Sequence, residues 1–267
     1  MQYKKSQKEI KNLIQGMAGK YSSYDIFRDF IVLSACTISN SVDKQQWQKR
    51  EDMYLEIIAK YTKYEANKFA EMLALMVLAY ESRMGDFIGE LYMTMDFGNK
   101  HVGQFFTPYD VSKMMSTMIY KSKKTEKLIT LNEPSCGSGG MIVAFAEAMK
   151  LDERNYQTDL RVVCNDLDYD AVRMCYVQLS LLGIDAIVYQ KNTLTPIDDP
   201  PGEIWFTPMH ILNLARQKQA QENDKTKQVV KAMQDLIALE TPKKDKIKEP
   251  VMAGSPGQMD IFDFLED

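Results

Sequence analysis

Residues 132–140 read NEPSCGSGG, and they lie between a short apolar run at residues 127–132, KLITLN, and an Ala-rich stretch from Gly140 to Met149. Glycines let the backbone turn sharply and approach a ligand, and the first turn of a following helix offers free N–H groups to an anion. The order of strand, glycine loop and helix therefore predicts a site for the carboxylate or phosphate of a nucleoside-containing cofactor. An ordinary tight turn is the simpler alternative.

Strand and helix patterns alternate after this loop. Apolar strands are predicted at residues 160–165 and 186–189, and helices at residues 140–149 and 170–182. Strands that alternate with helices form parallel sheets through crossover connections. We therefore expect an α/β fold in which this half of the chain is a Rossmann-like parallel sheet.

The residues around the glycines narrow the choice of cofactor. No Lys-Ser or Lys-Thr pair follows them, which disfavours the phosphate loop of an ATPase. In Rossmann-like sheets an acidic side chain at the end of the next strand contacts the ribose hydroxyls. Asp166 is the first candidate for that contact and Asp168 the second.

The rest of the chain divides by pattern. Residues 1–100 carry apolar side chains at three- and four-residue steps and contain no proline, which predicts an N-terminal helical domain. Residues 101–212 form the predicted Rossmann-like domain, with a helix beginning near Tyr109. A polar helix is expected at residues 213–240, and a flexible linker with a short apolar peptide at residues 241–267.

Length and charge limit the class of protein. The chain has 267 residues, of which 45% are hydrophobic, and a formal net charge of -4. No apolar run approaches the roughly 18–20 residues that cross a bilayer, and no signal peptide begins the sequence. We expect a cytoplasmic protein that does not span a membrane. The acidic balance disfavours unaided binding to nucleic acid, which usually requires a basic surplus.

Cysteine and histidine give no sign of a metal site in the sequence. The four cysteines, Cys36, Cys136, Cys164 and Cys175, contain no Cys-x-x-Cys pair, and only two histidines occur. A disulfide framework and a structural zinc site are therefore not expected, and no metal is predicted. Cys136 is interpreted as a small packed residue in the loop. A cytosine methylase is disfavoured because no Pro-Cys pair supplies its nucleophile.

The glycine loop resembles the first cofactor motif of the N6-adenine DNA methyltransferases of type I restriction-modification systems, usually Asp-Pro-x-Cys-Gly-Ser-Gly-Gly. Glu133 replaces the usual Asp. Residues 103–108, GQFFTP, are similar to the family's other cofactor motif, which precedes the glycine loop. The resemblance covers about residues 65–195. A nicotinamide-dependent oxidoreductase, which the loop alone would allow, leaves residues 103–108 without a role.

The resemblance implies a class I methyltransferase fold with a truncated sheet and S-adenosylmethionine as cofactor. The residues that it places around the cofactor are Phe105, Thr107, Pro108, Glu133, Gly137, Gly139 and Asp166. It further implies adenine-specific methylation of DNA in a restriction-modification system or a mobile element. DNA would be reached through a specificity or partner subunit, because no domain that reads DNA sequence is visible.

The catalytic segment departs from the family pattern. In the family a strand ends in Asn-Pro-Pro-Phe or a close variant, whose side chains and carbonyl accept the hydrogens of adenine N6 while the aromatic ring stacks on the flipped base. Here Asp199-Pro200-Pro201 is followed by glycine, and the nearby aromatic residues that could stack on the base are Trp205 and Phe206. Asp199, Pro200 and Trp205 are thus the candidate catalytic residues, and no further strand is expected after Thr195.

Two functions stay open on these residues. One is an S-adenosylmethionine-dependent, adenine-specific DNA methyltransferase. The other is a catalytically inactive protein with a methyltransferase fold, which acts through a partner or the replication sliding clamp. The clamp is suggested by a resemblance of the C-terminal peptide to short clamp-binding peptides of bacterial DNA-metabolism proteins. Its residues are Gln258, Met259, Asp260, Ile261 and Phe262.

Overall fold

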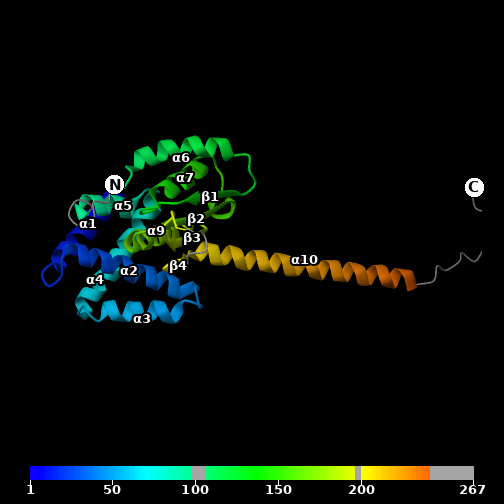
Figure 1. Cartoon of the computed structure of the whole chain (residues 1–267), viewed down its shortest axis with the longest axis horizontal. Coiled ribbons are helices and arrows are strands. Elements are labelled where there is room, and N and C mark those ends of the chain that lie inside the picture. Colours follow the sequence, from blue (N-terminus) through cyan, green and yellow to red (C-terminus); the bar gives the residue numbers. More distant parts are fainter. Residues whose placement is uncertain (98–105, 196–199, 241–267) are drawn as a thin grey trace, which may run out of the picture. The chain divides into compact units, whose positions relative to one another are not determined.

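The computed structural model describes residues 1–97, 106–195 and 200–240. Met1–Gln219 forms one compact unit, and Ala220–Asp267 is assigned to a second. The helices and strands are labelled in Figure 1. In chain order they are α1 (Gln2–Met17), α2 (Ser23–Val42), α3 (Trp47–Ile58), α4 (Lys63–Ser82), α5 (Phe87–Thr94), α6 (Tyr109–Lys123), β1 (Ile129–Glu133), α7 (Gly140–Leu151), α8 (Tyr156–Asp159), β2 (Leu160–Asp166), α9 (Tyr169–Leu181), β3 (Ala186–Gln190), β4 (Glu203–Phe206) and α10 (Pro208–Glu240).

The expected helical N-terminal part consists of α1 to α5, and local signals set where its longer helices begin. The Ser22 hydroxyl and the Asp25 carboxylate form a capping box at the start of α2, and Thr62 and Glu65 do the same at α4. α1 packs on α4, and α2 packs on α9 of the Rossmann-like part. The helices and the sheet therefore share one apolar core, and the predicted boundary at residue 100 does not separate two compact units.

The sheet has the order β1-β2-β3-β4. β1 pairs with β2 and β2 with β3 in parallel, as the alternating pattern predicts. β4 pairs with β3 in the antiparallel direction, and Val188 lies opposite Trp205. The expectation that no strand follows Thr195 is therefore wrong. β4 has only four residues, too few for a periodic pattern to stand out, and its place depends on pairing with β3.

One face of the sheet is covered better than the other. The Cys164 sulfur on β2 lies 3.9 Å from that of Cys175, so this face of β2 packs against α9. Val163 points to the opposite face and is 38% exposed. Among the described residues β1 also has no neighbour on its outer edge. Parallel sheets are almost always covered on both faces, so this one has an open side.

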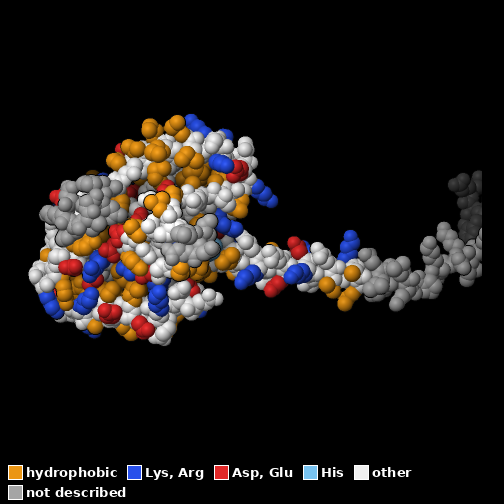
Figure 2. Space-filling model, in the orientation of Figure 1, with side chains coloured by type: hydrophobic (Ala, Val, Ile, Leu, Met, Phe, Trp, Pro, Cys, Tyr) orange, Lys and Arg blue, Asp and Glu red, His pale blue; other side chains and the backbone are white. Residues whose placement is uncertain are grey.

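The helix α6 adds to the exposed apolar surface. Its buried residues include Ser112 and Ser116, and it packs against α7. The side of α6 that faces away from α7 carries an exposed apolar stripe. It includes Met114, which is 61% exposed, and Met118, which is 67% exposed. Figure 2 shows hydrophobic side chains gathered over this helix. No helix in the described part of the chain is long and apolar enough to span a membrane.

Candidate functional site

The glycine loop joins β1 to α7 through two residues in the left-handed region of backbone space. Gly137 has φ +53° and Gly139 has φ +93°. A Cβ atom at Gly137 would lie 2.9 Å from a ring carbon of Phe106, and one at Gly139 would lie 3.1 Å from the Cys175 sulfur. Both the backbone conformation and the close packing therefore require glycine.

Asp166 holds the loop from the end of β2. Its carboxylate accepts hydrogen bonds from the backbone N–H of Gly137, at 2.9 Å, and of Asp168, at 3.0 Å. The Asp168 carboxylate instead caps α9 by accepting from the N–H of Asp170. Asp166 lines the cavity at the glycine loop, whereas Asp168 lines a separate hollow beside α2 and α3. The two candidates for the ribose contact thus face different cavities.

Sequence reasoning did not identify Asp86, which caps α5 and lies on the opposite side of the loop from Asp166. The Asp86 carboxylate is 3% exposed and accepts hydrogen bonds from Ser138 Oγ at 2.9 Å and Gln178 Nε2 at 3.0 Å. Gln178 also accepts from the Tyr80 hydroxyl at 2.6 Å. The only sequence signal was that Asp86 falls within residues 65–195, the range over which the sequence resembles the family.

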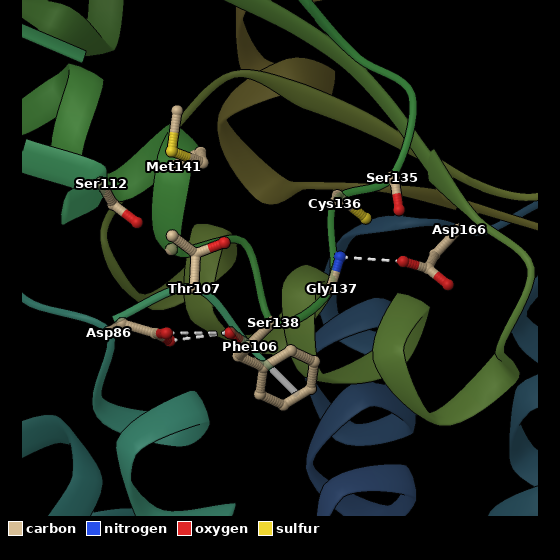
Figure 3. Close-up of a pocket in the computed structure, with 11 residues that line it drawn as sticks. Asp86, Phe106, Thr107, Ser112, Ser135, Cys136, Gly137, Ser138, Met141 and Asp166 are labelled. Atoms are coloured by element: carbon tan, nitrogen blue, oxygen red, sulfur yellow. Dashed lines mark hydrogen bonds between the residues drawn. The ribbon is translucent and has the colours of Figure 1, made fainter. Parts of the chain in front are cut away.

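These residues enclose a cavity at the carboxyl ends of β1 and β2 (Figure 3). Its volume is about 200 Å³, and it is partly open to solvent. The described residues that line it are Asp86, Phe106, Thr107, Ser112, Ser135, Cys136, Gly137, Ser138, Gly140, Met141 and Asp166.

The charges around the cavity are one-sided. Asp86 and Asp166 contribute carboxylates, and no Lys or Arg is among the described residues that line it. α7 begins at this cavity without a side-chain cap, so the free N–H groups of its first turn offer the positive element of the site. Burial raises the pKa of Asp86, against the effect of its hydrogen bonds to Gln178, Ser138 and Gly89. Loss of solvent thus makes this carboxylate costly to ionise, and a cationic ligand group would relieve that cost.

The other predicted cofactor residues lie in different places. Thr107 lines the cavity, as does its neighbour Phe106, whereas Pro108 forms the N-cap of α6. Glu133 ends β1 and accepts a hydrogen bond from the Ser135 N–H at 3.2 Å. Burial raises its pKa. Phe105 lies outside the described residues.

The predicted catalytic residues are placed differently. Trp205 is 1% exposed, with the Arg50 guanidinium 3.3 Å from its ring centroid and the Tyr176 ring at 4.9 Å. Because its ring is buried against these two neighbours, Trp205 packs in the core of this structure. Pro200 is exposed, and Asp199 lies outside the described residues, as does the peptide at residues 258–262.

Comparison with known families gives a match to part of the chain. The family model described as N-6 DNA Methylase matches residues 81–211, a range that contains the glycine loop, Asp86 and Asp166. None of the curated proteins matches the sequence.

Several solved structures are similar to part of this chain. A Listeria monocytogenes protein described as a class I S-adenosylmethionine-dependent methyltransferase shares 14% identity over 66% of this chain and 57% of its own, with a TM-score of 0.36. The type I restriction-modification methyltransferase subunit of Streptococcus thermophilus shares 21% sequence identity. The match covers 61% of this chain and 36% of that subunit, with a TM-score of 0.41. A chain in the structure of a DrdV–DNA complex shares 15% sequence identity. The match covers 68% of this chain and 21% of that chain, with a TM-score of 0.31. This chain thus spans less than two thirds of the length of each of these three chains.

Proposed function

We propose that the cavity at the glycine loop binds S-adenosylmethionine and that the chain acts in the methylation of adenine N6 in DNA, because residues 81–211 match the N-6 DNA Methylase family model. The function is therefore that of an adenine-specific DNA methyltransferase subunit. When bound, S-adenosylmethionine supplies an electrophilic methyl group.

The charge of the cavity is the observation that carries the choice of cofactor. S-adenosylmethionine has a sulfonium, an ammonium and a single carboxylate, whereas nicotinamide dinucleotides and ATP carry several negative phosphates. Two carboxylates line the cavity, and the described lining has no basic side chain. Phosphates would be repelled by Asp86 and Asp166, but a ligand with two cationic groups would be attracted.

Each part of the cofactor has a candidate partner. Asp166, at the end of β2, is proposed for the ribose hydroxyls. The N-terminus of α7 suits the carboxylate, since its free N–H groups favour an anion. Asp86, 3% exposed and at the opposite side of the loop, suits the ammonium. Thr107, with Phe105 and Pro108 beside it in sequence, is proposed to cover the ligand.

For the chemistry on adenine, Asp199 and the carbonyl of Pro200 are the chain's own candidates. Their role is to accept the hydrogens of N6, so that its lone pair becomes available to the methyl group. The backbone N–H of Gly202 donates to the Gln190 carbonyl at 3.0 Å, so Gly202 lies beside the carboxyl end of β3. That end lies at the same edge of the parallel strands as the glycine loop. Trp205 is left out of this proposal, because its ring is buried.

A partner polypeptide is proposed to bring the DNA. Val163 is exposed on one face of the sheet, β1 has no outer neighbour among the described residues, and α6 exposes Met114 and Met118. Because β1 leads into the glycine loop, a subunit seated at the open edge of β1 would lie next to the cavity. A specificity or second methyltransferase subunit fits that place.

Calorimetric titration tests the cofactor proposal. S-adenosylmethionine should bind, Asp166→Ala should weaken binding, and ATP and NAD should not compete. Failure of S-adenosylmethionine to bind would contradict the proposal. For the reaction, transfer of a tritiated methyl group to adenine-containing duplex DNA is the assay. If the activity survives Asp199→Ala, Asp199 is not the acceptor.

A further inference from the structure

Three of the four cysteines meet directly beneath the cofactor loop. Cys136 lies in the loop, Cys164 on β2 and Cys175 on α9, and their sulfur atoms all lie within 4.8 Å of one another. All three are free thiols. They are separated by up to 39 residues in sequence, 175 − 136, so spacing alone gives no sign of the cluster.

One sulfur–sulfur distance in the cluster matches the geometry of a metal site. The sulfurs of Cys164 and Cys175 lie 3.9 Å apart. A metal ion bonded to thiolates at about 2.3 Å holds its sulfur atoms roughly 3.8–4.0 Å apart, depending on whether it is tetrahedral or trigonal. This pair therefore already has the separation that a metal centre imposes.

The surroundings of the cluster also fit. Cys164 and Cys175 are fully buried, and Cys136 is 6% exposed and lines the cofactor cavity, which gives an ion a path to the cluster. Among the described residues no carboxylate or histidine belongs to the cluster. A set of ligands made only of thiolates selects soft ions such as zinc over magnesium or calcium.

The geometry points to a binding site for a thiophilic metal ion, Zn²⁺, formed by Cys136, Cys164 and Cys175 under the glycine loop. The bound ion joins the loop to β2 and to α9. Cys136 is the residue whose carbonyl accepts from the Gly139 N–H at 2.7 Å, so fixing its sulfur also fixes the turn that the cofactor requires. The site is distinct from the carboxylates proposed to contact the cofactor.

Titration of the full-length protein, without a histidine tag, with Zn²⁺ and then Cd²⁺ tests this site. Cd²⁺ binds thiolates more tightly than Zn²⁺ does, so it should displace Zn²⁺ and give a thiolate-to-metal charge-transfer absorption of the intensity expected for three cadmium–sulfur bonds. Zn²⁺ binding should release protons, because thiols must ionise to bind the metal. An absorption that corresponds to one bond or none would overturn the proposal.

Single variants locate the ligands. Cys136→Ala, Cys164→Ala and Cys175→Ala should each weaken Zn²⁺ binding by more than the roughly 10–100-fold cost of removing a group that only orients a metal ligand. Cys36→Ala is the matched control, because Cys36 is equally buried but lies outside the cluster. Unchanged binding in Cys164→Ala, or an equal loss in Cys36→Ala, would contradict the assignment.

If a cluster variant fails to fold, the wild-type absorption and the proton release still decide the question. Neither measurement depends on S-adenosylmethionine. A protein that binds Zn²⁺ but not S-adenosylmethionine would keep this inference and contradict the proposed function.

Discussion

The glycine loop and the segment at residues 200–206 both resemble motifs of one family, but their surroundings differ. Asp86, Ser138 and Asp166 surround the loop with polar groups that face an open cavity. In the other segment, the aromatic candidate Trp205 is enclosed by Arg50 and Tyr176. A residue of the right type near a motif is therefore not enough for a site. The side chain must also face a space that a ligand can enter.

The largest expected effect comes from Trp205→Ala. Removing a buried tryptophan usually costs about 3–5 kcal/mol of unfolding free energy. Here it also takes away the ring against the Arg50 guanidinium and the indole N–H that donates to Glu203 at 2.9 Å. Denaturant unfolding should show this loss, while the fraction that stays folded binds S-adenosylmethionine normally.

Trp205→Phe is the control, because it keeps a ring in the same place and should recover part of the stability. If Trp205→Ala unfolds like the wild type but abolishes methyl transfer, then Trp205 serves the reaction and the contrast between the two regions is wrong.

Asp166→Ala should have the next largest effect, on binding rather than on folding. Hydrogen bonds to charged groups contribute about 1.5–3 kcal/mol, which corresponds to roughly 10–150-fold in Kd. The variant also releases the Gly137 N–H, which donates to Asp166 at 2.9 Å. Calorimetry with S-adenosylmethionine measures the change.

Asp168→Ala is the matched comparison, since Asp168 caps α9 and lines another cavity. It should lower stability by about 1 kcal/mol, as loss of a helix cap does, with little change in Kd. Equal effects of the two variants on Kd would remove the distinction between them.

Gly137→Ala tests the backbone of the loop. A side chain in the left-handed region costs about 1–2 kcal/mol, and the new Cβ would meet Phe106 at 2.9 Å. Thermal unfolding should show this loss together with weaker cofactor binding. Gly16→Ala, in α1 with no atom within 4 Å of the new Cβ, should leave stability the same or higher. A Gly137→Ala protein as stable as Gly16→Ala would contradict the strain argument.

The smallest effect is the pH dependence that Asp86 introduces. Burial raises its pKa in the folded protein above the ordinary value of 3.8, so its ionisation opposes folding. Relative to Asp86→Asn, the wild type should therefore be equally stable below pH 3.8 and lose stability as the pH rises through the raised pKa. Unfolding in denaturant over a pH series measures the difference.

The same Asp86→Asn variant should bind S-adenosylmethionine more weakly, because the neutral amide no longer attracts the ammonium. Its stability therefore changes in the opposite direction to its cofactor affinity. A variant that becomes less stable than the wild type at neutral pH, with unchanged affinity, would assign Asp86 a purely structural role.

Local parts of the fold and the site could be predicted because their signals lie within a few residues. The helix at residues 109–121 was predicted close to its observed bounds, Tyr109–Lys123, and the strand at residues 160–165 corresponds to β2. The glycine loop could be identified because Gly137 and Gly139 supply backbone conformations that other residues rarely adopt. Periodicity and turn chemistry act over these short distances.

Other features depend on pairs of residues far apart in the chain. Asp86 meets Ser138 across 52 residues and Gln178 across 92, and no local pattern marks either contact. β4 was missed for the same reason, since its pairing with β3 and not its own four residues makes it a strand. Whether Trp205 is exposed also depends on Arg50 in α3, which lies far from it in the sequence.

The sequence by itself therefore determined the alternation of strands and helices, the glycine loop and the match of residues 81–211 to the N-6 DNA Methylase family model. The tertiary structure decided which acidic side chains face the cavity, that Trp205 is enclosed, and that three scattered cysteines meet beneath the loop. The physical reason is that backbone preferences are set by neighbouring residues, whereas cavities, burial and metal geometry arise only when distant segments pack against one another.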